Sequence, residues 1–525
     1  MRTFTITIFC FLLLTSTSVF AQQNGLNVTT ETKIMGKNYM DNSDIKGVEL
    51  MFPDQIQNYF IDTVSNFLSV QLRDCNSGGK KYCTSGNILQ YDLMNKRILW
   101  SKKIDYQTDE LLKFGNLLIY NDSNDSYGID AKTGIILGKM THPILYANPE
   151  KNICMAYKRL NSNEFTNILV GYSLNNKQLW SRNINREYGW NDLFYLNDST
   201  LLVVAAGLHT ININTGEGWD YNTITGEKIY SSDSDGAMMM GMMFGLVGAL
   251  LYSAVANNDA VRTEENVIRD INSNTLIDNE FIYFASQEQM AKIDKQTGKI
   301  AWQNRFNRKW TSKSSIFMDD SVVYMINHGY AFRNNNHITH GRTFIAAFDK
   351  QSGKQIYNTL LKYGTIIDFK QIGKELYVLF QTRIVKYNLE TGSYSSIKIY
   401  PNESLKVLKN FIDEKTFFIL HNGNIVNPMQ TDSTHLHIYS NQRKIFSIDN
   451  SLHIINKIDY KDDAVCFLVY DNYEFVANRE KTFIINKEGQ IIAELNVSSN
   501  AFIVGDYLYD KKDRSFYAVD LKEVL

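Results

Sequence analysis

The sequence has almost no net charge and no long block of one sign. Its 54 Lys and Arg residues balance 56 Asp and Glu residues, giving a formal net charge of −2. Capture of nucleic acid requires a basic surface, so we expect no nucleic-acid partner. Proline is scarce, with 5 residues, whereas Tyr and Phe number 31 and 29. Aromatic and β-branched residues broken by Gly, Asn and Asp predict many short strands.

The sequence also lacks the short motifs that mark common enzyme sites. It contains no Gly-x-Ser-x-Gly elbow, no phosphate-binding glycine-rich loop and no His-Glu-x-x-His metal site. We therefore predict a non-enzymatic protein with no catalytic residues, no cofactor and no resident metal.

A secretory signal peptide is predicted over residues 1–21. Arg2 precedes a short apolar run from Phe9 to Leu14, and a small-residue cleavage site ends at Ala21. The apolar run is too short to span a membrane. The protein is therefore expected to be exported, with residues 22–525 forming one repetitive domain.

Cysteine is rare, and Cys10 lies inside the predicted signal peptide. Cys75 and Cys83 flank the turn-like segment Asn76–Gly79, and exported proteins meet an oxidising compartment. These positions favour a local disulfide, with two free thiols as the alternative. No second close pair of ligands accompanies them, so a zinc site is not predicted.

A short sequence motif, which we call the phrase, recurs along the chain. Asp294, Gly298 and Trp302 belong to the clearest copy, and Asp349, Gly353 and Tyr357 repeat it in register. Other copies share only the first part of the phrase, an Asp or Asn followed by Thr-Gly; they begin at Asp130 (with Gly134), Asn212, Asn222 and Asn388. Weaker copies begin at Asp92, Ser173, Ser440 and Asn486, and a truncated one lies at Asp520.

Each part of the phrase has a physical role in a β-hairpin. An Asp or Asn side chain accepts hydrogen bonds from backbone N–H groups two or three residues on, which fixes a turn. Glycine supplies the left-handed conformation of a bulged hairpin. The aromatic residue starts the next strand and can pack against a neighbouring sheet. Every copy therefore predicts one hairpin.

The spacing of the copies predicts a β-propeller. Asp92 to Asp130 and Asp349 to Asn388 each approximate one four-stranded blade of roughly 40–50 residues. Apolar strand candidates fill the gaps between copies: Leu117–Tyr120, Leu201–Val204, Val322–Met325 and Leu376–Leu379. We predict an all-β single propeller of about eight four-stranded blades, with seven as the alternative.

The phrase Asp-x-x-Thr-Gly-x-x-x-Trp resembles the repeat of pyrroloquinoline-quinone-like (PQQ-like) propellers over most of residues 80–525. That family includes BamB-like proteins of the outer-membrane barrel-assembly machine and the quinoprotein alcohol dehydrogenases. The resemblance implies a periplasmic or outer-membrane-associated scaffold that binds an envelope protein. A quinone-dependent oxidoreductase and a ligand- or glycan-binding propeller are the alternatives. The adjacent cysteine pair of the dehydrogenases is missing here.

An insertion in one blade is predicted at residues 231–275. Residues 236–256 are uncharged and rich in Met and Gly, and Gly241, Gly245 and Gly248 share one helical face. One membrane crossing there would divide the propeller between two compartments. We expect this segment to dock on an apolar surface, which can belong to the propeller, a partner or a membrane.

Two groups of histidines lie in predicted loops. His328, His337 and His340 belong to the first group, and His421, His435 and His437 belong to the second. A metal site needs three or four converging ligands. The expected role of both groups is that of surface histidines in long propeller loops.

Overall fold

A computed structural model describes the chain from Leu26 to Leu525 with internal gaps. The gaps are residues 63–64, 76–81, 106–109, 123–124, 160–164, 185–189, 191, 206, 223–267, 270, 287, 334–335, 381–382, 399–415, 422–423, 432–434, 441–443, 450–451, 453, 460–464, 478–480 and 487–489. Side chains of some further strand residues, including those of β32–β36, also lie outside the description.

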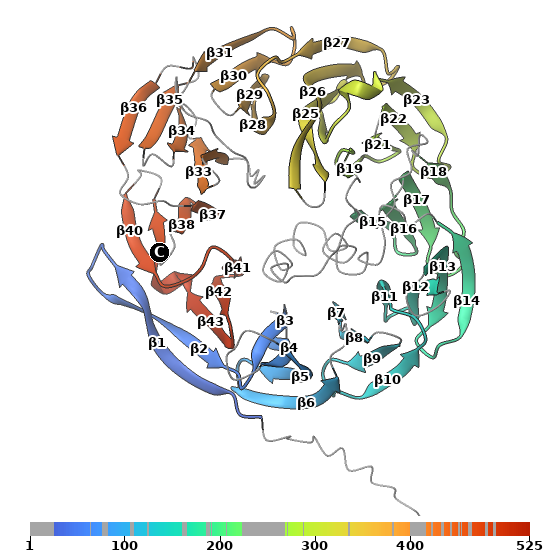
Figure 1. The fold of residues 1–525 in the computed structure, drawn as a ribbon, viewed down its shortest axis with the longest axis vertical. Helices are drawn as coiled ribbons and strands as arrows, with labels where there is room; N and C mark the ends of the chain where they lie inside the picture. Colours follow the sequence, from blue (N-terminus) through green and yellow to red (C-terminus); the bar gives the residue numbers. More distant parts are fainter. Residues whose placement is uncertain are drawn as a thin grey trace, which may run out of the picture.

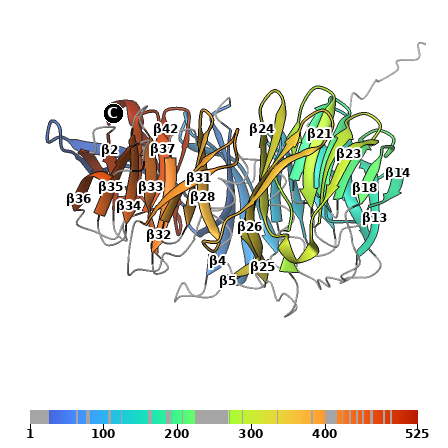
Figure 2. The ribbon, with the colours of Figure 1, turned by 90° about the horizontal axis from the view of Figure 1, so that it is seen from above.

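The described strands form a ring of antiparallel blades, so the predicted all-β propeller is confirmed (Figure 1). In most blades the first strand lies nearest the centre of the ring and the last strand lies at the outside. Seen from the side, the blades form a disc with loops on both faces (Figure 2).

Blades 1–5 follow the chain in order. Their strands are β3 (Gln55–Asp62), β4 (Phe67–Cys75), β5 (Tyr82–Asp92) and β6 (Arg97–Asp105); β7 (Glu110–Phe114), β8 (Leu117–Asn121), β9 (Ser126–Asp130) and β10 (Ile136–Met140); β11 (Tyr146–Asn148), β12 (Ile153–Arg159), β13 (Phe165–Ser173) and β14 (Gln178–Asn183); β15 (Asp192–Asn197), β16 (Thr200–Ala205), β17 (Gly207–Asn212) and β18 (Asp220–Asn222); and β20 (Leu276–Ile277), β21 (Phe281–Ser286), β22 (Gln289–Asp294) and β23 (Ile300–Arg305).

Blades 6–9 continue in the same way, and the short strand β19 (Ile268–Arg269) is added to blade 6 beside β25. Their strands are β24 (Ser314–Met318), β25 (Val322–Arg333), β26 (Asn336–Asp349) and β27 (Gln355–Leu360); β28 (Ile366–Ile372), β29 (Glu375–Phe380), β30 (Arg383–Asn388) and β31 (Tyr394–Lys398); β32 (Thr416–His421), β33 (Asn424–Thr431), β34 (His435–Ser440), β35 (Lys444–Asp449) and β36 (Ile454–Asp459); and β37 (Val465–Tyr470), β38 (Tyr473–Ala477), β39 (Thr482–Ile485) and β40 (Ile491–Leu495). Two 3₁₀ turns, η1 (Arg308–Trp310) and η2 (Leu521–Glu523), complete the described elements.

Blade 10 closes the ring with strands from both ends of the chain. Strands β41 (Phe502–Val504), β42 (Tyr507–Lys512) and β43 (Ser515–Asp520) pair with the early strand β2 (Asp44–Met51). Strand β1 (Thr29–Asn38) pairs with β2 and, through Gly36–Asn38, with β40 of blade 9. Pairing the first strands with the last removes the open edges that an unclosed ring would expose.

The described sheets resolve into ten blades, so the predicted number of about eight, and the alternative of seven, is wrong. Eight sheets supply one blade each, and the nine-stranded sheet supplies blades 9 and 10. Weak copies of the phrase still form hairpins, because residues other than Gly adopt the left-handed conformation. Lys96 has a φ of 51° and Asn176 a φ of 61° in the hairpin turns of blades 1 and 3.

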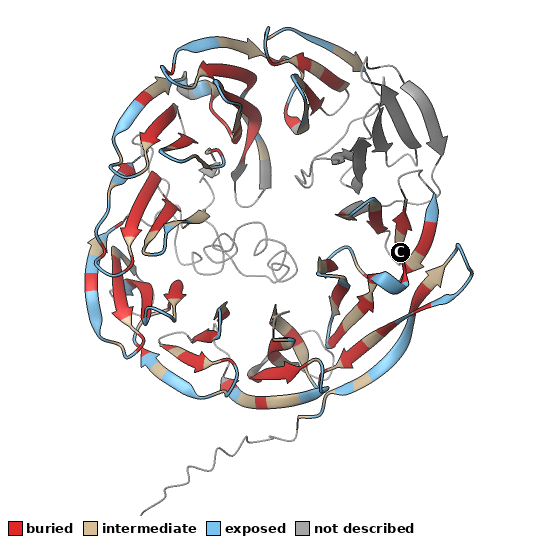
Figure 3. Cartoon of the chain, turned by 180° about the vertical axis from the view of Figure 1, so that it is seen from behind, coloured by how far each residue is buried: buried red, intermediate tan, exposed pale blue. Residues whose placement is uncertain are grey.

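The second strand carries much of the core in several of the described blades. All residues of β8 are buried, as are all but the first residue of β16, β21 and β29. These strands have neighbouring blades on both faces, which explains their continuous apolar runs in the sequence. The outer strands are largely exposed, as in β10 and β14 (Figure 3).

Candidate functional site

The repeat turns are fixed by hydrogen bonds within the phrase itself. The Asp294 carboxylate accepts hydrogen bonds of 2.7 Å from both the backbone N–H and the hydroxyl of Thr297. Gly298 has a φ of 70° and its N–H donates to the Asp294 carbonyl at 2.9 Å. The Thr297 hydrogen bonds hold the pKa of Asp294 below its usual value.

The same turn geometry recurs at two other strong copies. Asp130 caps the turn that contains Gly134, and Asp349 caps the turn that contains Gly353. Both glycines have a φ of 72°. The structure therefore places these four residues, with Asp294 and Gly298, in hairpins between the third and fourth strands of blades 2, 5 and 6.

The aromatic residue of the phrase joins one blade to the next. Trp302 of blade 5 lies against Gly353 of blade 6, and its indole N–H donates to the Lys350 carbonyl at 3.1 Å. Equivalent indole bonds run from Trp100 to Ala131, from Trp180 to Ile213 and from Trp219 to Lys295, and the Tyr357 hydroxyl bonds to the Leu389 carbonyl. The repeat residues are thus used in assembling the ring.

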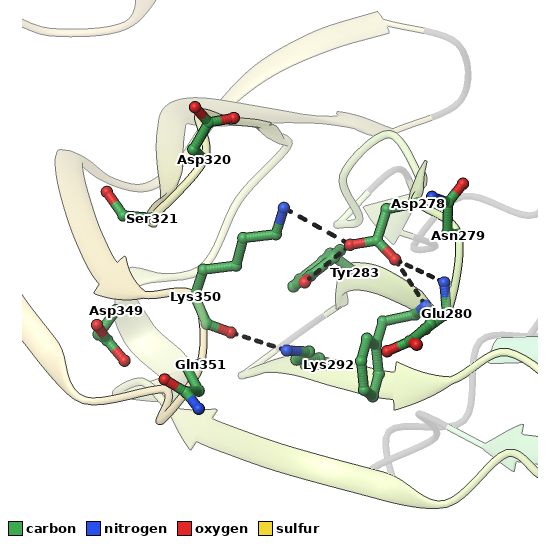
Figure 4. A pocket seen from close by; sticks show the side chains of 11 residues that line it. Asp278, Asn279, Glu280, Tyr283, Lys292, Asp320, Ser321, Asp349, Lys350 and Gln351 are labelled. Carbon is green, nitrogen blue, oxygen red and sulfur yellow. Dashed lines mark hydrogen bonds and ion pairs between the residues drawn. The ribbon is translucent and has the colours of Figure 1, made fainter.

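A recess of about 650 Å³ opens between blades 5 and 6 (Figure 4). It lies on the face that carries the turns between first and second strands and between third and fourth strands, which we call the turn face. Its wall from blade 5 comes from the β20–β21 turn and from β21 and β22. Its wall from blade 6 comes from the β24–β25 and β26–β27 turns.

Asp278 connects the two walls of the recess. Its carboxylate accepts hydrogen bonds from the N–H groups of Phe281 at 2.7 Å and Glu280 at 3.0 Å. It also accepts a 3.2 Å bond from the Tyr283 hydroxyl and lies 3.6 Å from Lys350 Nζ across the junction. Burial acts to raise the pKa of Asp278, but these donors outweigh it and hold the pKa below its usual value.

Lys292 is the buried cation of the recess, with 8% of its surface exposed. Its Nζ donates a 3.0 Å hydrogen bond to the Lys350 carbonyl and lies 4.0 Å from the centroid of the Phe281 ring. Burial lowers the pKa of Lys292, and the charge of Lys350 lowers it further. Hydrogen bonding and the aromatic ring partly offset the cost of placing this ammonium group in the wall.

The recess was not predicted from the sequence. Its residues lie in two successive repeats, and no single repeat contains both lysines. One usable signal is the position two residues before the capping Asp. Lys292 occupies it in blade 5, whereas Gly128 and Ala347 occupy it in blades 2 and 6. Lys386 also occupies this position in blade 7. A charged residue there therefore distinguishes blades 5 and 7 from blades 2 and 6, but does not by itself identify the recess.

The prediction of histidine loops is wrong. His328 lies in β25 and His337 and His340 lie in β26, within a long hairpin, while His421 ends β32 and His435 and His437 lie in β34. Pairing between adjacent strands satisfies the backbone groups of both regions. His328 is also not at the surface: it is 2% exposed and its Nε2 lies 2.9 Å from the Ser315 hydroxyl.

The remaining predicted sites fall partly outside the description. The register pairs Cys75 with Tyr82, next to Cys83, but the side chains of both cysteines are not described, and the disulfide stays a prediction. Gly241, Gly245 and Gly248 lie outside the described residues, as does most of the predicted insertion. Among described side chains, no three His, Cys, Asp or Glu groups could share a metal ion. Within the described ranges, no helix could cross a bilayer.

Comparison with protein-family models and with curated proteins gives no match. Similar solved structures include BamB from Moraxella catarrhalis, at 11% identity and a TM-score of 0.30, covering 74% of this chain and 96% of that one. They also include the computationally designed Ika8 protein, at 9% identity and a TM-score of 0.29, covering 71% of this chain and 95% of that one. A third is Sqt1 from Saccharomyces cerevisiae, at 9% identity and a TM-score of 0.29, covering 75% of this chain and 93% of that one. Sequence identities and TM-scores this low assign neither a family nor a function.

Proposed function

We propose that this chain is an exported, non-enzymatic scaffold that binds a protein partner at a bacterial cell envelope. We further propose that the partner docks on the turn face over the junction of blades 5 and 6. The N-terminal 21 residues support export, since they have the pattern of a signal peptide. The resemblance of the repeat to PQQ-like propellers supports the envelope location.

The recess is the observation that carries the proposed binding role. Exposed side chains from both blades surround its mouth: Asn279, Glu280, Asp320, Ser321 and Gln351. Turns held on a rigid scaffold provide positioned contacts at little cost in conformational entropy. The docked Trp302 and the hydrogen bond from Lys292 to the Lys350 carbonyl fix the two walls relative to each other.

A photo-crosslinking amino acid at Gln351 tests the docking position in cells that express the full chain. Gln296 is the matched control, because it is exposed at the equivalent place in the preceding repeat turn and does not line the recess. A discrete crosslinked protein from Gln351 but not from Gln296 is expected. Identical patterns at both positions, or none at either, would overturn docking at this junction.

The non-enzymatic part of the proposal has its own test. Purified protein is mixed with a quinone cofactor and calcium, and dye reduction is followed with alcohols and with sugars. No reduction above the rate without protein is expected. Turnover that depends on both the protein and the quinone would overturn this part and establish an oxidoreductase.

A further inference from the structure

We propose that the recess between blades 5 and 6 binds a carboxylate group that has a positively charged neighbour, with the carboxylate held by the ammonium groups of Lys292 and Lys350. The part of this proposal that assigns the carboxylate to a protein rests on the proposed function. The two lysines come from different blades and both line the recess. Lys292 reaches the backbone carbonyl of Lys350, whose own side chain extends to Asp278 (Figure 4).

Lys350 is suited to exchange its present contact for a ligand. Its Nζ lies 3.6 Å from the nearer Asp278 oxygen, beyond the usual length of an N–H···O hydrogen bond. Asp278 also accepts three other hydrogen bonds, from Glu280, Phe281 and Tyr283. The ammonium group can therefore turn toward a bound carboxylate without leaving Asp278 unsatisfied.

Lys292 supplies a second, fixed ammonium group. One hydrogen bond ties its Nζ to the Lys350 carbonyl, and the Phe281 ring lies on another side of it. An ammonium group has three donors, so this bond leaves capacity for a ligand oxygen. Because Lys292 is buried and fixed, little side-chain entropy is lost when it binds an anion.

The acidic groups of the recess select against highly charged anions. Asp278, Glu280, Asp320 and Asp349 line it together with the two lysines, so four carboxylates face two ammonium groups, a formal balance of −2. This surplus repels a phosphate dianion more strongly than a carboxylate, whose single negative charge a cationic neighbour on the same ligand can balance. A cationic neighbour on the ligand would pair with the exposed Glu280 and Asp320 at the mouth.

Two sources of such a group fit this chemistry. One is an acidic side chain flanked by Lys or Arg in an extended segment of a partner protein. The other is a free amino acid, such as glutamate, whose ammonium group is the cationic neighbour. Both would place a carboxylate against the same two lysines.

Ligand-observed NMR on the full mature chain tests the proposal. The probes are acetyl-Lys-Glu-Lys-amide, the same peptide with Gln in place of Glu, and free glutamate. The Glu peptide is expected to bind at least tenfold more tightly than the Gln peptide. Lys350→Gln is expected to weaken binding of the Glu peptide at least tenfold. Lys354→Gln, a change at an exposed lysine of the same turn outside the recess, is expected to have no effect.

Lys292→Met tests the second ammonium group while keeping an apolar stem in the wall. A thermal melt establishes whether this variant is folded. If Lys292→Met does not fold, the Lys350→Gln variant still tests the proposal. Equal binding of the Glu and Gln peptides, or equal effects of Lys350→Gln and Lys354→Gln, would overturn the carboxylate site. Binding of glutamate alone would support the site and exclude a protein as its source. Absence of binding by all three probes, with the Gln351 crosslink retained, would overturn this inference and leave the proposed function standing.

Discussion

Trp302 of blade 5 lies directly against Gly353 of blade 6, and the two residues belong to successive copies of the repeat. Gly353 has a φ of 72°, and a Cβ on it would overlap the indole carbons of Trp302. The backbone of Lys350 in the same turn accepts the indole N–H. Glycine is thus required for two reasons, its left-handed conformation and the close approach of the ring.

Gly353→Ala is expected to destabilise the protein more than an alanine at another left-handed glycine. Gly373 has a φ of 59°, and no atom lies within 4 Å of the place that a Cβ would take, so Gly373→Ala isolates the backbone cost. We expect about 1–2 kcal/mol for Gly373→Ala, and about 1–3 kcal/mol more for Gly353→Ala because Trp302 must move. Urea denaturation measures both, and equal losses would contradict the role given to the Trp302 contact.

Tyr357→Phe is expected to weaken the junction of blades 6 and 7 without removing the ring. The Tyr357 hydroxyl donates a 2.7 Å hydrogen bond to the Leu389 carbonyl, in the place that an indole N–H occupies at other junctions. Its loss is expected to cost about 1 kcal/mol. Tyr507→Phe is the control, because Tyr507 is 43% exposed and pairs with Asp520 within its own blade. A Tyr357 variant as stable as the Tyr507 variant would show that the hydroxyl contributes nothing to the junction.

The hairpins and strands could be predicted from the sequence because their determinants are local. Asp294, Thr297 and Gly298 form their turn within five residues, and the apolar run at Leu117 marks a strand buried on both faces. The number of blades could not be obtained in the same way. Lys96 and Asn176 replace Gly in their turns, so the sequence phrase fades where the hairpin persists.

The candidate recess could not be predicted because it depends on contacts between repeats. Lys292 contacts Lys350 across the junction at which Trp302 holds blade 5 against blade 6. The sequence indicated that the aromatic residue packs on a neighbouring sheet, but not that its partner is the glycine of the next copy. Asp278 lies outside the phrase altogether, in the turn before β21.

Gly36→Ala is expected to disturb the closure of the ring. Any Cβ on Gly36 would overlap the carbonyl oxygen of Glu494, where β1 pairs with β40. We expect a loss of about 1–3 kcal/mol and faster amide exchange in β1 and β40. Thr32→Ala is the control, since Thr32 is an exposed residue of β1 that pairs only with β2 among the described strands. Unchanged exchange in β40 of the Gly36 variant would contradict the closing role of this contact.

The predicted Cys75–Cys83 disulfide can be checked chemically. A non-reducing peptide map of the protein is expected to link the two cysteines. The chain-entropy account of such a short loop gives about 2–3 kcal/mol of stabilisation. Ready alkylation of both thiols without a reductant would refute the bridge. Buried Cys154 serves as an internal control, because burial raises the pKa of its thiol to about 12 and keeps it unreactive in the folded state.

His328 is expected to make the stability of the protein depend on pH between 7 and 5. Burial, with a smaller contribution from the charge of Lys313, lowers the pKa of His328 to about 3. The folded state therefore favours the neutral ring, whereas the unfolded chain binds a proton near pH 6.5. Stability from this residue is fully present above pH 6.5 and is lost as the pH falls toward 3. The expected loss between pH 7 and pH 5 is about 2 kcal/mol.

Denaturant titrations at pH 7, 6 and 5 measure this effect in the wild type, in His328→Asn and in His142→Asn. Burial also lowers the pKa of His142, so the second variant removes another histidine that titrates in the same direction. The unfolding free energy of His328→Asn is expected to vary less with pH than that of the wild type, by about 2 kcal/mol over this range. The unfolding free energy of His142→Asn is expected to keep the pH dependence that His328 contributes, because His328 is still present in this variant. A His328 variant with the same pH dependence as the wild type would contradict this assignment, since the Asn side chain cannot titrate in this window.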